Sequence, residues 1–413
     1  MDGDQHFHNY LYSVAYVYTV RYVYALFNIH FDCQLYPDHA IGYAYSNHYF
    51  IPNNSIPITM TDILPFLKSM ISAPGLSGHE APIARIIEEK WQTLVDETSI
   101  SRVGSLHGLK KGSGGGKKRH SIMIATHMDA IGMMVSTIED GFLHITNIGD
   151  VDIRVLPGAT VTVHASSGDE LPAVIAMPPA RFLPEGESSG AVAIKHLLVD
   201  TGLTQREVEK KVRVGDLVSF ANEPLELASG VVSGHTLDNR ASVAALTVCL
   251  EELQGKSHIW DVWAVATVQE ETSYLGAYTS AFQLRPDIAI AVDGTFAKGP
   301  GANDWQTHPM GKGVGLCIGP NMHPFLHEKL QEVADKFEIP WFLDVTPTHS
   351  GTDAYPMQTT MEGIPTALVE YPLRYMHTTV ESVAIKDLQR VGRLLAEFIA
   401  SLDENFVETI VWE

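Results

Sequence analysis

Residues 121–131, SIMIATHMDAI, contain the stretch that decides the fold. Ser121–Thr126 is a short, continuously apolar run, which is typical of a strand buried on both faces. It ends directly at His127, which is followed by Met128 and Asp129. A buried strand that ends in polar, metal-capable side chains predicts an α/β sheet with a ligand site beyond its carboxyl edge.

The alternation of apolar strands and helical patterns continues along the chain. Further strands are predicted at Ile259–Val268, Asp287–Val292, Val314–Ile318, Trp341–Val345 and Thr366–Glu370. Helices are predicted at Asn239–Leu253, His323–Phe337, Asp353–Met361 and Lys386–Leu402, after an earlier helix that runs to about Val95. For that earlier helix, Ser77 and Glu80 have the spacing of a capping box. Strands that alternate with helices predict an α/β fold with a mainly parallel sheet covered on both faces.

The stretch from about Gly132 to Val231 interrupts this alternation. It consists of short strand patterns separated by Gly, Pro and Asp turns, with little helical pattern. Strands at such spacing predict a small β-barrel. We therefore expect residues 132–231 to form a β-rich domain inserted into an α/β domain made of residues 60–131 and 232–413.

Residues 1–59 differ from the rest of the chain. They hold 10 of the 15 tyrosines, one arginine and no lysine, and an ordinary protein start follows at Met60-Thr61-Asp62. We expect the ordered fold to begin near Met60, with residues 1–59 an extension or an upstream stretch included through a misplaced start codon. The run 10–29 is long enough for a membrane span. Arg21 interrupts it and tyrosine dominates it, so no membrane anchor is predicted.

Composition limits the classes of partner. The chain has 45% hydrophobic residues, as globular proteins do, and a net charge of −21, which argues against nucleic acids and anionic membranes as partners. Cys33, Cys249 and Cys317 are far apart and lack the spacing of a zinc finger. We interpret them as free thiols in a reducing compartment, which predicts a cytoplasmic protein.

Five places put metal-capable or acidic residues at strand ends or helix starts. They are His127-Met128-Asp129, Asp238-Asn239-Arg240, Glu270-Glu271, Asp293-Gly294 and His377. Each alone has an ordinary explanation; Asp238, for example, is the residue type that a helix N-cap requires. Together they predict one site, because the crevice beyond the carboxyl ends of the strands is where α/β sheets bind ligands.

Two histidines and three carboxylates form a suitable ligand set for a pair of divalent ions. Zinc binds imidazole and carboxylate groups, and two-metal hydrolases share one carboxylate between ions about 3.5–4 Å apart. A further acid is needed to deprotonate the attacking water. Glu270 and Glu271 suit a division of these roles, because neighbouring side chains diverge past a strand end. Asp129 is placed to fix the tautomer of His127.

The sequence resembles the tetrahedral aminopeptidase family, which includes glutamyl, leucyl and deblocking aminopeptidases and belongs to the di-metal co-catalytic peptidase clan. The resemblance covers essentially all of residues 60–413 and none of 1–59. It is carried by motifs that occur in the family's order: ATHMDAIGMMV, GHTLDNRASVAAL, TVQEETSYLGA, AVDGT, SGTDA and PLRYMHTTVE.

The resemblance implies a function and a role for each site residue. The protein would be a metalloaminopeptidase that holds two ions per subunit, most plausibly zinc, with cobalt or manganese as alternatives. His127 and Asp293 would bind one ion, Glu271 and His377 the other, and Asp238 both. Glu270 would be the general base that activates a water held between the metals, and Asp129 would orient His127.

The resemblance also implies partners and an assembly. Substrates would be peptides with a free N-terminus, the inserted domain would mediate dimerisation, and dimers would assemble further into a dodecamer. The chain departs from the family pattern at 350–355 and 373–375, near the expected substrate pocket, so substrate preference is not transferred. Asp353 and Arg374 are interpreted as a helix cap and a packing residue.

Two other functions are compatible with parts of the sequence. A carboxypeptidase or amide deacylase would use the same di-metal scaffold, since a fold does not define a substrate. A non-enzymatic binding protein on an inactive peptidase fold usually lacks a ligand or the base, whereas all seven positions are intact here. A cellulase would need two carboxylates in a sugar cleft, and these acids are better explained as metal ligands.

Overall fold

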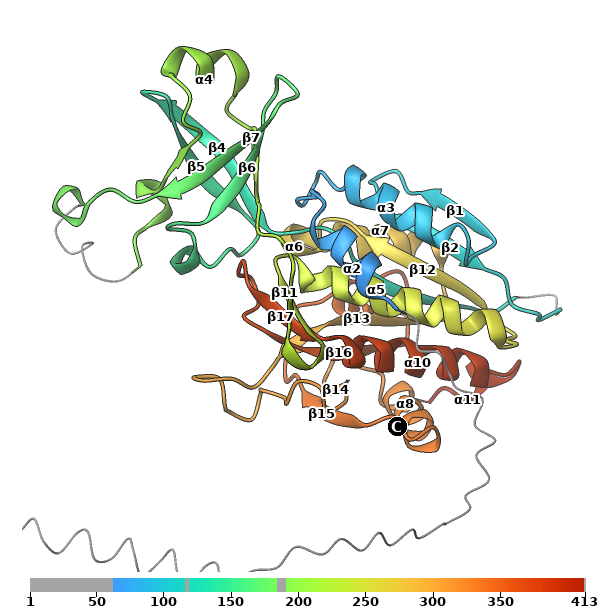
Figure 1. Cartoon of the computed structure of the whole chain (residues 1–413). Helices are drawn as coiled ribbons and strands as arrows, with labels where there is room; N and C mark the ends of the chain where they lie inside the picture. Colours follow the sequence, from blue (N-terminus) through green and yellow to red (C-terminus); the bar gives the residue numbers. More distant parts are fainter. Residues whose placement is uncertain (1–61, 116–118, 184–190, 412–413) are drawn as a thin grey trace, which may run out of the picture. The chain divides into compact units, whose positions relative to one another are not determined.

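The structure is a computed structural model that describes residues 62–115, 119–183 and 191–411. The predicted extension 1–59 and the run 10–29 lie outside the described residues. Among the residues that are described, no helix is both long and apolar enough to cross a membrane. The α/β fold with an inserted small β-barrel is confirmed (Figure 1).

A large mixed sheet forms the α/β part. Its central strands are β12 (Asp261–Thr267), β3 (Ser121–His127), β13 (Ile288–Phe296) and β16 (Thr366–Arg374), in that spatial order and mutually parallel. The flanking strands are β1 (Glu97–Ile100), β2 (Leu106–Lys110), β17 (Glu381–Ala384), β11 (Val231–Gly234), β10 (Leu225–Leu227), β14 (Val314–Ile318) and β15 (Trp341–Val345). Parallel pairing holds for the four central strands and for β14 with β15, whereas the other flanking pairs are antiparallel.

Helices cover both faces of this sheet, as the alternating pattern predicts. The longer ones are α2 (Leu64–Ile71), α3 (Ala81–Trp91), α5 (Leu237–Glu252), α7 (Leu275–Leu284), α8 (Pro324–Lys336) and α10 (Ile385–Ser401), and the shorter ones are α6 (Glu270–Ser273), α9 (Ala354–Gln358) and α11 (Phe406–Thr409). The helix α4 (Gln205–Lys211) belongs to the inserted part instead (Figure 1).

Alternate strand residues enter two different cores. On β3, Ile122 and Ile124 pack in a core with residues of α2, α3, α5 and α10, while Met123 and Ala125 pack with residues of α7 and α9. Side chains of neighbouring strand residues point to opposite faces. His127, two residues after Ala125, therefore emerges on the α7/α9 face.

The inserted part is a closed barrel with a hydrophobic core of its own. Its strands are β4 (Gly132–Glu139), β5 (Phe142–Ile148), β6 (Thr160–His164), β7 (Glu170–Ala176), β8 (Leu198–Asp200) and β9 (Leu217–Phe220). The strand β10, which lies inside the predicted range 132–231, belongs to the large sheet instead, together with β11, which begins at the end of that range. A dimerisation role for this barrel remains a prediction.

The capping box predicted for Ser77 and Glu80 is wrong. Glu80 is the N-cap residue of α3, but its side chain does not cap the helix. Its carboxylate accepts hydrogen bonds from the backbone N–H groups of Gly78 and Gln269, and the Ser77 hydroxyl pairs with that of Thr272. Both side chains therefore support the loop that carries Glu270, rather than the start of a helix.

Candidate metal centre

His127 and Asp293 reach the site from two adjacent strands. Ala125 of β3 and Ala291 of β13 are partners in register, and both belong to the core beneath α7 and α9. His127 and Asp293 each follow two residues later in their strands, so they emerge at the same level on the same face. Both are almost completely buried.

Asp238 and His377 approach from the start of α5 and from the loop after β16, which meet at the carboxyl edge. Asp238 lies in the first turn of α5 with φ/ψ values that are not helical, and the N-cap residue of this helix is Thr236. The N-cap interpretation of this residue is therefore not supported. His377 follows β16, and its φ of 62° lies in the left-handed region. Such a conformation is uncommon for a residue with a side chain and is frequent at functional sites.

Glu270 and Glu271 open the short helix α6 directly after β12. The residue before them, Gln269, also has a left-handed backbone, with φ 54°. This turn is fixed by Asp129, whose two carboxylate oxygens accept the backbone N–H groups of Glu270 at 3.0 Å and Glu271 at 3.3 Å. Asp129 thus positions both glutamates as well as His127, whose Nδ1 lies 3.5 Å from Asp129 Oδ1.

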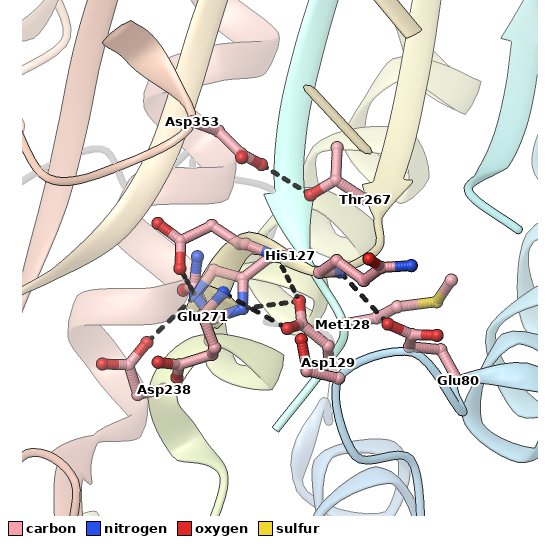
Figure 2. Close-up of polar contacts among 12 residues, drawn as sticks. Glu80, His127, Met128, Asp129, Asp238, Thr267, Glu271 and Asp353 are labelled. Carbon is pink, nitrogen blue, oxygen red and sulfur yellow. Dashed lines mark hydrogen bonds and ion pairs between the residues drawn. The ribbon is translucent and has the colours of Figure 1, made fainter. Parts of the chain in front are cut away.

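The structure brings all of the sequence-predicted site residues together. His127 Nε2 lies 3.2 Å from Asp238 Oδ1, and His377 Nε2 lies 3.7 Å from Asp238 Oδ2. His377 Nε2 is also 3.6 Å from Glu271 Oε2. The two oxygens of Asp238 therefore face two different histidines. Figure 2 shows the contacts that His127 makes with Asp129 and Asp238.

The carboxylates of this cluster repel one another. Burial, with the charges of neighbouring acids, raises the pKa of Glu270, Glu271 and Asp293 well above the usual range. Burial lowers the pKa of His127, but Glu270 and the hydrogen-bonded Asp129 outweigh it and hold this pKa well above its ordinary value. Such a centre is short of positive charge.

The donor set fits divalent cations. His127, Glu270 and Asp293 form one group whose ligand atoms lie within 4.8 Å of one another, and His127, Asp238 and Glu271 form another. Glu271 Oε1 is buried without a hydrogen-bond partner, so it is free to act as a ligand. Glu270 Oε2 lies 3.7 Å from His127 Nε2, so this carboxylate also faces the centre.

Two acids outside the predicted set hold the backbone of the site in place. Glu381 of β17 is buried and accepts the backbone N–H of Asp238 at 3.0 Å and that of His377 at 2.8 Å. Glu80 accepts the backbone N–H of Gln269 at 3.1 Å. Sequence reasoning did not find these roles, because Glu80 resembles a helix-capping residue, while Glu381, the last residue of the motif PLRYMHTTVE, acts on backbone N–H groups that no side-chain pattern reveals.

The two residues left out of the predicted site have different environments. Asp353 precedes α9 but does not cap it; its carboxylate accepts the Thr267 hydroxyl at 2.5 Å, as Figure 2 shows. Burial raises the pKa of Asp353 to about 6. The helix-cap interpretation of Asp353 is therefore wrong. Arg374 donates from Nε to the Lys298 carbonyl.

The candidate ligands line a cavity of about 520 Å³. This cavity lies at the carboxyl ends of the central strands, the usual place for a ligand in this architecture. Besides the ligands, its walls include side chains of Tyr274, Phe296, Asp344, Glu370 and Met376. The space is sufficient for a residue of a peptide, since small-molecule pockets in proteins start at about 300 Å³.

The fold and this centre define the class of protein as an α/β protein with a barrel insertion and a candidate metal centre at the carboxyl edge of its sheet. The family model described as M42 glutamyl aminopeptidase matches residues 104–394, so the chain belongs to that family. It is accordingly a peptide hydrolase of the aminopeptidase type.

Individual relatives agree with this assignment. The chain is 32% identical to the lysyl aminopeptidase of Pyrococcus furiosus over 340 residues, which cover 81% of this chain and 96% of that protein. Among solved structures, an aminopeptidase from the archaeon Desulfurococcus kamchatkensis has a TM-score of 0.78 and 34% identity, covering 84% and 97% of the two chains. The TET1 peptidase of Pyrococcus horikoshii, described as able to assemble into a tetrahedron or a large octahedral shell, has a TM-score of 0.70 and 27% identity, covering 82% and 100%.

Proposed function

We propose that this chain is a di-metal aminopeptidase that removes residues from the free N-termini of peptides. The observation that carries the proposal is the position of Asp238, whose two oxygens face His127 and His377. A carboxylate between two imidazoles is what a pair of metal ions with one shared ligand requires.

Asp238 would serve both ions. His127 and Asp293 would hold one ion, and Glu271 and His377 would hold the other. Imidazole and carboxylate donors suit zinc best, and they also accept cobalt or manganese. The ions supply Lewis-acid chemistry, which lowers the pKa of water and stabilises negative charge on the scissile carbonyl oxygen.

The chain's own residues move the protons. Glu270 takes a proton from the attacking water and delivers it to the amine that leaves. This role is supported by its buried position next to the ligands and by its sequence position before the ligand Glu271. Asp129 holds His127 in one tautomer and fixes the backbone of the Glu270-Glu271 turn.

A substrate panel tests this function against its nearest alternative, a carboxypeptidase or deacylase on the same scaffold. We expect the metal-loaded protein to cleave peptides with a free N-terminus, to leave their N-acetylated forms intact, and to tolerate a blocked C-terminus. Cleavage of acetylated peptides, or dependence on a free C-terminus, would instead favour the alternative. Treatment with a chelator should abolish the activity, and zinc or cobalt should restore it.

We further propose that the subunits associate through the barrel, up to a dodecamer, and that the protein acts in the cytoplasm. The assembly is supported by the Pyrococcus horikoshii relative, which can assemble into a tetrahedron or a large octahedral shell. It is also supported by exposed apolar side chains on the barrel part, among them Phe182 and Met177. The location is supported by Cys249 and Cys317, which are unpaired and buried.

A further inference from the structure

The cavity holds two carboxylates that the proposed mechanism does not use, Asp344 and Glu370. Glu370 of β16 is the register partner of the proposed ligand Asp293 on β13. It lies two residues after Leu368, which packs in the core beneath α7 and α9, so its side chain emerges on the same face as Asp293. Glu370 therefore lies directly beside the metal centre.

Space for this side chain is provided by Gly315 on the next strand, β14. Gly315 is the register partner of Glu370, and a Cβ added there would lie 2.9 Å from the Cβ of Glu370 and 3.1 Å from the ring of Phe342. Any other residue at 315 would displace Glu370. Because residue 315 is a glycine, the Glu370 side chain has room beside β14.

The Glu370 carboxylate is buried, and one of its two oxygens has no partner. Only 5% of the residue is exposed, and Oε2 has no hydrogen-bond partner. Burial raises the pKa of Glu370 well above the usual range, and the negative charge of Asp344 and a hydrogen bond with it add to this effect. A carboxylate oxygen that is buried without a partner beside a second acid is costly, so the arrangement indicates that a cationic or donor group binds here.

Asp344 is held in place but only partly neutralised. Its Oδ2 accepts the Thr295 hydroxyl at 2.6 Å, and its Oδ1 lies 3.3 Å from Nε2 of His308. His308 in turn stacks on Phe342. No lysine or arginine is present among the described residues that line the cavity. A substrate side chain with a negative charge would therefore be repelled where it approaches Glu370 and Asp344.

The walls near these acids include apolar groups. Phe296, Val345 and Met376 line the same cavity. A lysine or arginine side chain combines an apolar stem with a charged head, and such residues bury the stem along apolar surface while the head reaches a polar partner. The apolar walls would contact the stem of such a side chain, and the buried acid would pair with its charged head.

We propose that the part of the cavity next to Glu370 and Asp344, called the recess below, receives the side chain of the substrate's N-terminal residue, and that Glu370, with Asp344, selects lysine or arginine. The inference rests on the proposed aminopeptidase function and names its substrate class. The ammonium or guanidinium head pairs with Glu370, and the α-amine remains at the metal centre. Glu370 and Asp344 are specificity-determining residues in this assignment and take no part in the proton transfers.

The test compares substrates of equal length on the full-length, metal-loaded protein. Lysine p-nitroanilide and norleucine p-nitroanilide have stems of similar length and differ in the charged amine, while glutamate p-nitroanilide reverses the charge. We expect kcat/KM to be about tenfold or more higher for lysine than for norleucine, with glutamate poorest. A wild-type enzyme that prefers norleucine or glutamate to lysine overturns the inference.

Variants test whether the preference for lysine depends on Glu370 and Asp344. Glu370→Gln should reduce the lysine-to-norleucine ratio of kcat/KM by about tenfold or more, and Asp344→Asn should reduce it in the same direction. The control Glu362→Gln removes an exposed acid that does not line the cavity and should leave the ratio unchanged. An equal loss with both substrates in Glu370→Gln and Asp344→Asn would show that these acids bind the α-amine or a third cation, which contradicts the proposal.

The outcome also separates this inference from the proposed function. If no p-nitroanilide or peptide with a free N-terminus is cleaved, the aminopeptidase proposal itself fails. If norleucine and leucine substrates are cleaved well without any preference for lysine or arginine, the aminopeptidase proposal stands and the assignment of the recess is wrong.

Discussion

Glu270 is the residue whose replacement separates catalysis from metal binding. Glu270→Gln keeps the size of the side chain but removes its ability to take up a proton, so we expect kcat to fall by about 100-fold or more. Metal content, measured by elemental analysis, should stay at the wild-type value. Glu271→Gln is the matched comparison, because loss of a ligand should lower the metal content as well. Near-normal turnover in Glu270→Gln would remove this residue from the role of base.

Replacing Glu381 should affect metal affinity, because its carboxylate binds backbone N–H groups of two proposed ligands. It accepts the N–H groups of Asp238 and His377 and so positions two proposed ligands at once. In Glu381→Gln the amide group cannot accept both bonds, and we expect metal affinity to fall by about tenfold to 100-fold. Competition with a chelator of known affinity measures this directly. The exposed Glu328 on α8 supplies a control, Glu328→Gln, which should bind metal normally. Unchanged affinity in Glu381→Gln would mean that β17 holds the ligands without this carboxylate.

At the scale of elements, the carboxyl ends of the strands could be predicted from sequence. Short apolar runs such as Ser121–Thr126 are buried by parallel neighbours, and the polar residue that ends each run is thereby placed at one edge. His127 and Asp293 follow this rule directly. Asp238 and His377 could be assigned to the site only from the whole set of motifs. Taken alone, an acid at a helix start is an ordinary cap residue and a loop histidine is an ordinary polar residue.

Cross-strand register could not be predicted in the same way. Glu370 and Asp344 are 26 positions apart and lie in different strands, β16 and β15, with β14 between them. Only the antiparallel pairing of β14 with β16 turns them into neighbours of the site, and apolar periodicity does not encode that pairing. A useful signal was present nonetheless: Glu370 is a single acid within the apolar run ALVEYPL, where a charge needs a reason.

Metal removal should weaken the elements that meet at the centre. The loops that carry Asp238, Glu270 and His377 bring acids together that repel one another without a cation. Ions that bind only the folded state stabilise it by mass action. We expect a chelator to lower the melting temperature by about 5 °C or more, and added zinc to restore it. Calorimetry with and without chelator measures the shift, and an unchanged melting temperature would argue that the site does not hold metal.

At the scale of the whole molecule, the barrel is the part proposed to join subunits. Phe182 is 67% exposed and Met177 is 46% exposed, although both are large and apolar. A double change, Met177→Glu with Phe182→Glu, should yield smaller particles in analytical ultracentrifugation because it places charges in the proposed interface. Val411→Glu replaces an exposed apolar residue outside the barrel and should leave the particle size unchanged. If the double variant assembles like the wild type, these side chains do not form the interface.

The extent of the functional unit is the remaining question at this scale. The described residues, all between 62 and 411, belong to one compact unit, and the match to the Pyrococcus furiosus enzyme accounts for 96% of that protein with 81% of this chain. Every proposed ligand, the base Glu270 and the supporting acids lie within this unit. A chain that starts at Met60 should therefore fold, assemble and hydrolyse substrates at the rate of the full-length protein. Circular dichroism, ultracentrifugation and aminopeptidase assays of the two proteins make the comparison. If the shortened chain unfolds or loses activity while the full-length protein is active, residues 1–59 contribute to the fold or to the site, and the boundary near Met60 is wrong.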